Sequence, residues 1–159
     1  MKKILLFTVR HIIRILPLAY MGLVWFLSSY PSDAVINTGL SFDVALKESM
    51  HLIEFSILYL LSVLALLSLG KLNQKSNFFL ALFSIFYGLL DEFHQYFVPS
   101  RSCTIIDFLK DVTGVMVAWY IVRRAYTVPN SKVKLLFEWF ETKVGQTTLK
   151  ESASPGQHN

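Results

Sequence analysis

The residues of this 159-residue chain that are best suited to chemistry lie between positions 87 and 114. They are Asp91, Glu92, His94, Gln95, Arg101, Asp107, Lys110 and Asp111. Carboxylates and histidine can transfer protons, whereas arginine and lysine can hold phosphate or carboxylate groups. The surrounding residues are apolar enough to cross a bilayer, where one charged side chain costs roughly 2.5–3.5 kcal/mol. Several charges there predict mutual pairing, a water-filled cavity or a ligand site rather than lipid contact.

Helical periodicity sorts these residues and their neighbours into three faces. A face about 100° wide holds Gly88, Asp91, Glu92 and Gln95, with His94 outside it. A second face of about 100° holds Asp107, Lys110, Asp111 and Gly114. A third, about 60° wide, holds Lys47, His51 and Glu54. The short connection 98–102 makes two of these helices antiparallel neighbours, so Arg101 lies over their shared end and the three faces can converge.

This cluster has more carboxylates than basic side chains. Its acidic members are Glu54, Asp91, Glu92, Asp107 and Asp111, and its lysine and arginine members are Lys47, Arg101 and Lys110. The excess favours a bound cation, a protonated carboxyl group or a protonated His51. The alternative is an ion-pair ladder of Asp107, Lys110 and Asp111 that neutralises itself.

His51 and Glu54, spaced i and i+3, resemble half of a carboxylate-bridged metal site. The sequence has neither an HExxH pattern nor a second H-x-x-E pattern. We therefore favour His51 as a hydrogen-bonding partner that orients Glu54 or Glu92, predict no metal, and leave any cofactor unidentified.

The composition is that of a membrane protein. Hydrophobic residues make up 53% and charged residues 16%, against norms of about 45–50% and about 25% in soluble domains. The pI of about 9.2 does not indicate nucleic-acid binding, because a basic stripe with base-stacking aromatics is missing. Cys103 is the single cysteine, so an intrachain disulfide is excluded.

Four apolar segments, at about 12–30, 50–70, 78–98 and 104–122, each approach the roughly 20 residues that a membrane-spanning helix needs. The first begins among basic residues and has no small-residue cleavage site after it, so we interpret it as a retained span rather than a signal peptide. A single chain this short, without regular alternation, cannot close a β-barrel. The predicted fold class is all-α, a polytopic membrane protein with four transmembrane helices within residues 1–126.

Basic residues precede the first segment, lie between the second and third, and follow the fourth. By the positive-inside rule both termini are cytoplasmic, while residues 31–49 and 99–103 face outward. The polar cluster then lies in the outer halves of the helices. Residues 127–145 are expected to form a cytoplasmic, interfacial amphipathic helix with Leu135, Leu136, Trp139 and Phe140 on its apolar face, and residues 146–159 a disordered tail.

The chain resembles the VanZ-like family over about residues 47–118. Residues 47–55 read KESMHLIEF, similar to the family's K-x-x-x-H-F-x-E-Y, and residues 91–102 read DEFHQYFVPSRS, similar to D-E-x-H-Q-x-F-V-P-G-R-S. Asp107, Asp111 and Gly114 match the following D-x-x-x-D/N-x-x-G. The chain departs from the pattern at Ser100, where glycine is usual, and at Phe55, where tyrosine is usual.

The resemblance implies a multi-pass protein of the bacterial cytoplasmic (inner) membrane, in a family named for a member linked to teicoplanin resistance. No settled activity comes with the family name. The charge topology and the polar faces predict an outward-facing pocket, which we expect to take an anionic lipid, a lipid-linked cell-wall intermediate or a glycopeptide antibiotic. Whether the pocket is catalytic stays open, as does the oligomeric state. The candidates for proton chemistry are His51, Glu92, Asp107 and Asp111. The candidates for ligand binding are Lys47, Glu54, Asp91, Gln95, Arg101 and Lys110.

Two other functions remain open. The carboxylates could relay protons or cations through a small transporter or channel, or the chain could be a structural or interaction protein with a self-neutralised core. A relay across the membrane needs polar groups along its whole length. The inner halves of the second and third segments offer little beyond Tyr59, Ser62 and Ser84, which favours the pocket.

Overall fold

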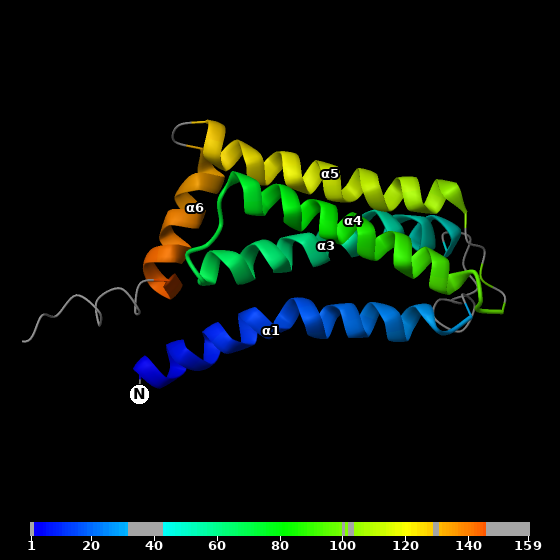
Figure 1. The fold of residues 1–159 in the computed structure, drawn as a ribbon, viewed down its shortest axis with the longest axis horizontal. Coiled ribbons are helices and arrows are strands. Elements are labelled where there is room, and N and C mark those ends of the chain that lie inside the picture. Colours follow the sequence, from blue (N-terminus) through cyan, green and yellow to red (C-terminus); the bar gives the residue numbers. More distant parts are fainter. Residues whose placement is uncertain (1, 32–42, 100, 102–103, 129–130, 146–159) are drawn as a thin grey trace, which may run out of the picture.

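The computed structural model describes residues 2–31, 43–99, 101, 104–128 and 131–145. These residues form five α-helices and one π-helix and contain no strand, so the predicted all-α class is confirmed (Figure 1). The helices are α1 (Lys2–Ser28), α3 (Asp43–Ser68), α4 (Gln74–Gln95), α5 (Ile105–Thr127), α6 (Lys132–Phe140) and η1 (Glu141–Gly145).

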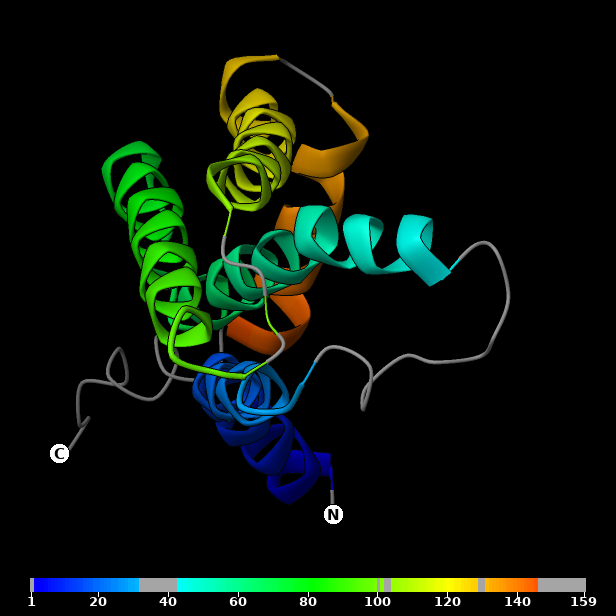
Figure 2. The same cartoon turned by 90° about the vertical axis from the view of Figure 1, so that its right-hand side faces the viewer.

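The four long helices run side by side in alternating directions, and α6 packs across one end of them (Figure 1). The view along the bundle in Figure 2 shows α1 and α5 on opposite sides of α3, which packs against α1, α4 and α5. We call the end where α1 and α4 finish the Arg101 end. The opposite end, where α3 and α5 finish, is called the α6 end. The antiparallel arrangement gathers all three predicted polar faces at the Arg101 end.

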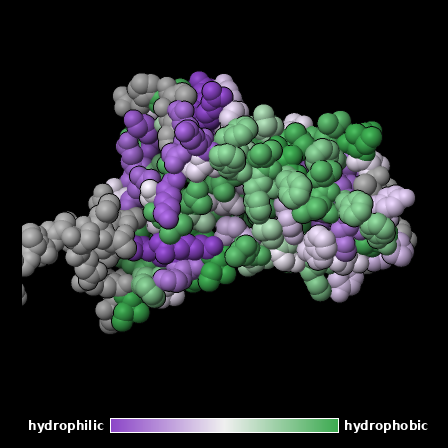
Figure 3. Space-filling view, in the orientation of Figure 1, coloured by the Kyte–Doolittle hydropathy of each residue, from purple (hydrophilic) through white to green (hydrophobic). Residues whose placement is uncertain are grey.

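The interior is apolar along most of the bundle. Its largest fully buried apolar side chains are Val24, Phe55, Leu58, Tyr59, Val63, Leu67 and Val115. The outer surface is apolar as well, because large hydrophobic side chains of every long helix are exposed, and Figure 3 shows them covering much of one face. A bundle that is apolar inside and outside is typical of a protein whose solvent is lipid.

Two helices, α1 over Ile4–Ser28 and α4 over Gln74–Gln95, are long and apolar enough to cross a membrane. The apolar part of α3, Leu52–Ser68, is shorter than a full span. In α5, Asp107, Lys110, Asp111, Arg123 and Arg124 interrupt the apolar sequence. Composition therefore supports a membrane protein and two of the four predicted spans, and it leaves the spans at 50–70 and 104–122 as predictions.

Side-chain caps define where three helices begin. Asn73 accepts a 2.9 Å hydrogen bond from the Ser76 amide at the start of α4, and the Ser76 hydroxyl accepts one of 2.8 Å from the Asn73 amide. Thr104 accepts from the Asp107 amide at the start of α5. Ser131 accepts from the Lys134 amide at the start of α6. These caps satisfy amides that have no partner within the helix.

Two arginines of α1 donate hydrogen bonds to residues near the ends of two other helices at the α6 end. Arg10, only 7% exposed, donates from Nε to the carbonyl of Val144 in η1. Arg14 donates to the hydroxyl and the carbonyl of Ser68, the last residue of α3. Phe137 of α6 packs against the core, whereas Leu135, Leu136 and Trp139 of the predicted apolar face are exposed. The interfacial location of this helix stays a prediction.

Candidate functional site

Three carboxylates and one amide side chain are almost fully buried at the Arg101 end. Their exposed fractions are 1% for Asp91, 3% for Glu92, 2% for Gln95 and 0% for Asp111. Burying a carboxylate is costly unless hydrogen bonds or opposite charges compensate it. Their partners therefore decide what this cluster can do.

Asp91 of α4 is held from two directions. Its Oδ2 accepts a 2.9 Å hydrogen bond from the Ser28 hydroxyl of α1 and one of 2.6 Å from Gln95 Nε2, one turn along α4. Its Oδ1 is buried and accepts no hydrogen bond within the described part of the chain. The carboxylate is thus oriented by α1 and by its own helix.

Arg101, in the connection between α4 and α5, donates hydrogen bonds to residues at the ends of α1 and α4. Its Nε donates to the Tyr30 carbonyl at 3.0 Å and its Nη2 to the Leu27 carbonyl at 3.0 Å, both at the end of α1. Its Nη1 donates to Gln95 Oε1 at 3.1 Å. A cation at these carbonyls also complements the negative end of the helix dipole. Arg101 therefore positions α1 against the Asp91–Gln95 pair.

His94 lies beside this network rather than in it, as its helical position predicts. Its ring stacks on Trp25 of α1, with centroids 4.1 Å apart and planes 21° apart. Its Nε2 is 3.0 Å from the Ser29 hydroxyl. These contacts make His94 a packing residue between α1 and α4.

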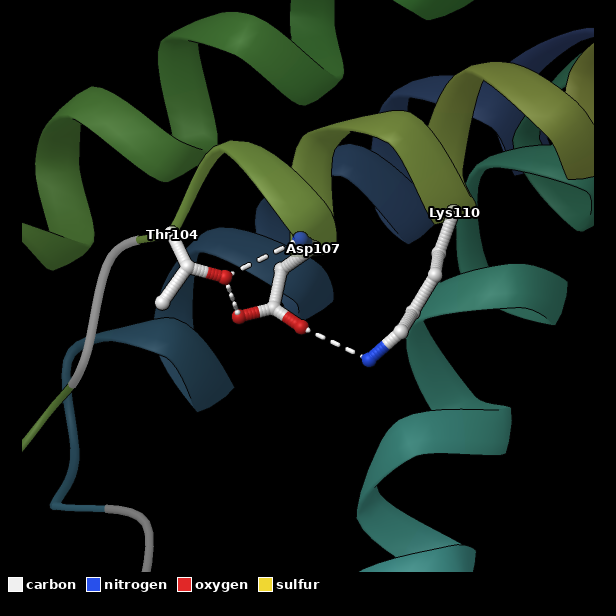
Figure 4. A network of polar contacts seen from close by, with 3 residues as sticks. All are labelled: Thr104, Asp107 and Lys110. Atoms are coloured by element: carbon white, nitrogen blue, oxygen red, sulfur yellow. Dashed lines mark hydrogen bonds and ion pairs between the residues drawn. The ribbon is translucent and has the colours of Figure 1, made fainter.

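The first turn of α5 contains a second network, drawn in Figure 4. The Thr104 hydroxyl donates to Asp107 Oδ2 at 2.5 Å, and Lys110 Nζ lies 3.0 Å from Asp107 Oδ1. The pair is partly exposed, with side-chain exposures of 26% for Lys110 and 16% for Asp107. The ion pair between Asp107 and Lys110 agrees with one rung of the predicted ladder. Asp107 is the acidic residue in the first turn of α5, where its charge complements the positive end of the helix dipole.

Asp111 is brought against α3 by a close crossing of α3 and α5. A Cβ placed on Gly114 would lie 1.9 Å from the Leu52 carbonyl oxygen and 2.5 Å from the Ser56 hydroxyl. Only glycine allows this approach. Asp111 lies one turn before Gly114 on the same helical face, so it faces the part of α3 that precedes Leu52. That part of α3 contains Lys47 and His51, whose side chains lie outside the described residues.

Glu54 of α3 is partly buried, and its backbone carbonyl accepts a 3.2 Å hydrogen bond from the Tyr20 hydroxyl of α1. Tyr87 of α4 donates to the Met21 carbonyl of α1 at 2.7 Å. Both contacts fasten α1 next to the polar cluster. The proton-transfer and ligand-binding roles assigned to the site residues stay predictions, because these contacts describe position and not chemistry.

Sequence reasoning missed the contribution of α1. It treated residues 12–30 as a plain span, but Ser28 and the carbonyls of Leu27 and Tyr30 complete the Asp91 and Arg101 network. One signal was available, because a buried aspartate needs a donor and Ser28 is a hydroxyl residue at the end of an otherwise apolar segment.

Within the described ranges, no group of three histidine, cysteine, aspartate or glutamate side chains lies close enough to hold a metal ion. Among the known proteins compared, a family model described as VanZ/LLP1 matches residues 6–126. No curated protein and no solved structure gives a significant match.

Proposed function

The chain belongs to the VanZ/LLP1 family, and from this premise we propose that it binds or modifies an anionic lipid or cell-wall intermediate at the Arg101 end. In this proposal it is a four-span protein of the bacterial cytoplasmic membrane with both termini inside. The Arg101 end then faces outward, because the basic residues of the loops and termini gather mainly at the α6 end. Protection against a glycopeptide such as teicoplanin is one consequence that the family name suggests.

The observation that carries this proposal is the burial of Asp91, Glu92 and Asp111 in an apolar bundle. Packing alone would be served as well or better by apolar residues of similar volume. Ionisable residues inside membrane helices are by default functional candidates. Their position on helices that converge at one end favours a pocket between helices over a path between the two ends.

The residues of the proposed site would have different roles. Arginine has five N–H donors, and Arg101 donates hydrogen bonds from three of them to Leu27, Tyr30 and Gln95. The remaining two, together with Lys47, would hold an anionic group. Glu92 and His51 would perform any proton transfer, as carboxylates and imidazole do in general acid–base catalysis.

Native mass spectrometry of the full chain, extracted gently from the membrane, tests this directly. We expect a co-purified anionic lipid or lipid-linked intermediate that is retained by wild type and lost in Glu92→Gln. Glu138→Gln is the matched control, because it removes the same charge from an exposed position of α6. Equal occupancy in wild type and Glu92→Gln would contradict the proposal.

One observation favours a second candidate, a non-catalytic structural protein. The contacts of Ser28, Asp91, Gln95 and Arg101 join α1, α4 and the following loop, which is what a purely structural network would do. A transporter is less favoured, since the hydroxyls of Ser62 and Ser84 donate to carbonyls of their own helices. The structural and the ligand-binding proposals predict different results of mutation. Mutation of a structural network lowers the stability of the protein, whereas mutation of a binding pocket lowers its ligand occupancy.

A further inference from the structure

A cleft lined by polar and aromatic side chains lies at the α6 end, far from the Asp91 cluster. It has a volume of about 320 Å³ and is lined by Gln74, Asn77 and Phe78 from the start of α4 and by Trp119 and Arg123 from the second half of α5. Figure 3 shows hydrophilic side chains gathered over this end of the molecule. None of these five residues belongs to the proposed site.

The lining presents hydrogen-bond donors. Asn77 is 1% exposed, and its Oδ1 accepts a 2.6 Å hydrogen bond from the Tyr59 hydroxyl, which leaves its amide nitrogen as a donor. Trp119 Nε1 is buried and has no acceptor among the described residues. Arg123 places its guanidinium carbon 5.0 Å from the centroid of the Trp119 ring, so a full positive charge lies beside the indole.

The surroundings of the cleft are positively charged. Residues 55–90 and 112–137 contain no aspartate or glutamate. The basic residues in these segments are Lys71, Lys75, Arg123, Arg124, Lys132 and Lys134. The start of α4, at Gln74, adds the partial positive charge of a helix N-terminus. Glu138 and Glu141 follow in α6 and η1, and Glu138 lies 3.9 Å from Lys134, so basic side chains still outnumber acidic ones at this end. Buried donors, a guanidinium and this excess of positive charge together favour an anion.

The apolar part of the lining indicates which anion. Phe78 forms one wall, and beside it the surfaces of α4 and α5 expose Phe79, Leu82, Met116 and Tyr120. A ligand with a charged head and an apolar tail matches both parts. Basic pockets between membrane helices on the cytoplasmic side are suited to acidic headgroups, and tryptophan favours that interface. We propose that this cleft binds the phosphate of an anionic phospholipid from the cytoplasmic leaflet, with Arg123, Trp119 and Asn77 as its donors.

The test uses the full chain in detergent micelles, titrated with phosphatidylglycerol or phosphatidylcholine and followed by native mass spectrometry. Phosphatidylglycerol should bind more tightly than phosphatidylcholine, because both carry a phosphate but the choline cation is repelled by the basic residues around the cleft. Arg123→Gln should weaken phosphatidylglycerol binding about tenfold, as expected for loss of a charged hydrogen bond. Arg124→Gln is the matched control, because it removes the same charge one residue further on and Arg124 does not line the cleft. It should weaken binding less than about threefold.

A second variant separates recognition from folding. Trp119→Phe keeps an aromatic ring but removes the Nε1–H, and it should weaken binding while the melting temperature stays near that of wild type. Competition by inorganic phosphate at millimolar concentration would identify free phosphate as the ligand of the same phosphate site, whereas no competition identifies the lipid. Equal loss in Arg123→Gln and Arg124→Gln, or equal binding of the two lipids, would overturn the proposal. Because the cleft lies at the opposite end from Glu92, Glu92→Gln should leave this binding unchanged whatever becomes of the proposed function.

Discussion

Ser28 and Asp91 lie 63 residues apart in the chain, and the Ser28 hydroxyl donates a 2.9 Å hydrogen bond to Asp91 Oδ2. Both side chains are buried, with exposures of 3% and 1%. The bond therefore joins the end of α1 to the last turns of α4 where water does not reach. It couples the position of α1 to the orientation of Asp91, the more deeply buried of the two carboxylates of α4.

Ser28→Ala should reduce the free energy of unfolding by about 1–3 kcal/mol, because a buried carboxylate loses one of its two donors. Thermal unfolding of the purified chain in micelles measures the loss. Ser62→Ala is the control, since Ser62 is also buried but donates only to the carbonyl of Leu58 on its own helix. The control should lose less than about 1 kcal/mol. Similar losses in both variants would show that the bond between the helices contributes little.

Arg101→Lys should also destabilise the bundle, although the charge is kept. A lysine ammonium cannot reach the Tyr30 and Leu27 carbonyls and Gln95 at once as the planar guanidinium does. We expect a loss of about 1.5–3 kcal/mol in micelles. Arg124→Lys, at the other end of the bundle and exposed, should change stability by less than about 0.5 kcal/mol. If the two variants melt at the same temperature, the fork geometry of Arg101 is unimportant.

Gly114→Ala should separate α3 from α5, because the new Cβ would lie 1.9 Å from the Leu52 carbonyl oxygen. Backbone cannot yield as a side-chain tip can, so we expect a loss of about 1–3 kcal/mol or failure to accumulate in the membrane. Gly22→Ala meets no atom within 4 Å and should be neutral or stabilising, with up to about 1 kcal/mol gained from helix propensity. Expression level and melting temperature of the two variants give the comparison. A well-folded Gly114→Ala would contradict the close crossing.

Much of the helical framework could be predicted from the sequence. Apolar runs of membrane length, the cap residues and the i, i+3, i+4 spacing of Asp107, Lys110 and Asp111 place the helices and the faces that converge. The first span was predicted at about 12–30, and the helix that contains it, α1, begins earlier, at Lys2. Basic residues at positions 2, 3, 10 and 14 limit the apolar segment, but they are compatible with helix, so hydropathy marks the span and not the helix end.

The partners of the polar residues were harder to predict. Arg101 was expected to bind an anionic ligand or a carboxylate, but its described contacts are two backbone carbonyls and an amide oxygen. Backbone carbonyls have no sequence signature, because every residue has one. Asp91 was predicted to bind ligand, which stays a prediction, and its Oδ2 accepts from Ser28 and Gln95, partners that the sequence analysis did not identify. A spacing argument finds which residues share a face, whereas tertiary contacts decide which of them saturate one another.

The proposed orientation predicts which loops are reachable from outside. In intact cells Cys103 should react with a membrane-impermeant thiol reagent, whereas a cysteine at position 75, introduced as Lys75→Cys in a cysteine-free background, should react only after the membrane is opened. Lys75 is exposed at the start of α4, so its accessibility depends only on the side of the membrane. Reaction at position 75 together with protection at Cys103 would invert the topology. Labelling of the solubilised protein checks that both thiols can react.

His51→Asn and Glu92→Gln should abolish the envelope phenotype while the chain still inserts and purifies, because both changes remove proton chemistry and nearly preserve volume. Glu92 is 3% exposed within the cluster at the Arg101 end, and His51 lies on α3 in the segment that Asp111 faces.

His94→Asn is the matched control, since the described contacts of His94 are stacking on Trp25 and a contact with Ser29. It should lose about 0.5–1.5 kcal/mol of stability from the lost stacking and keep most of the phenotype. The measurements are membrane abundance, melting temperature and survival under teicoplanin. Retention of the phenotype by all three variants would eliminate the pocket chemistry, and failure of His51→Asn and Glu92→Gln to accumulate would assign those residues to holding the helices together.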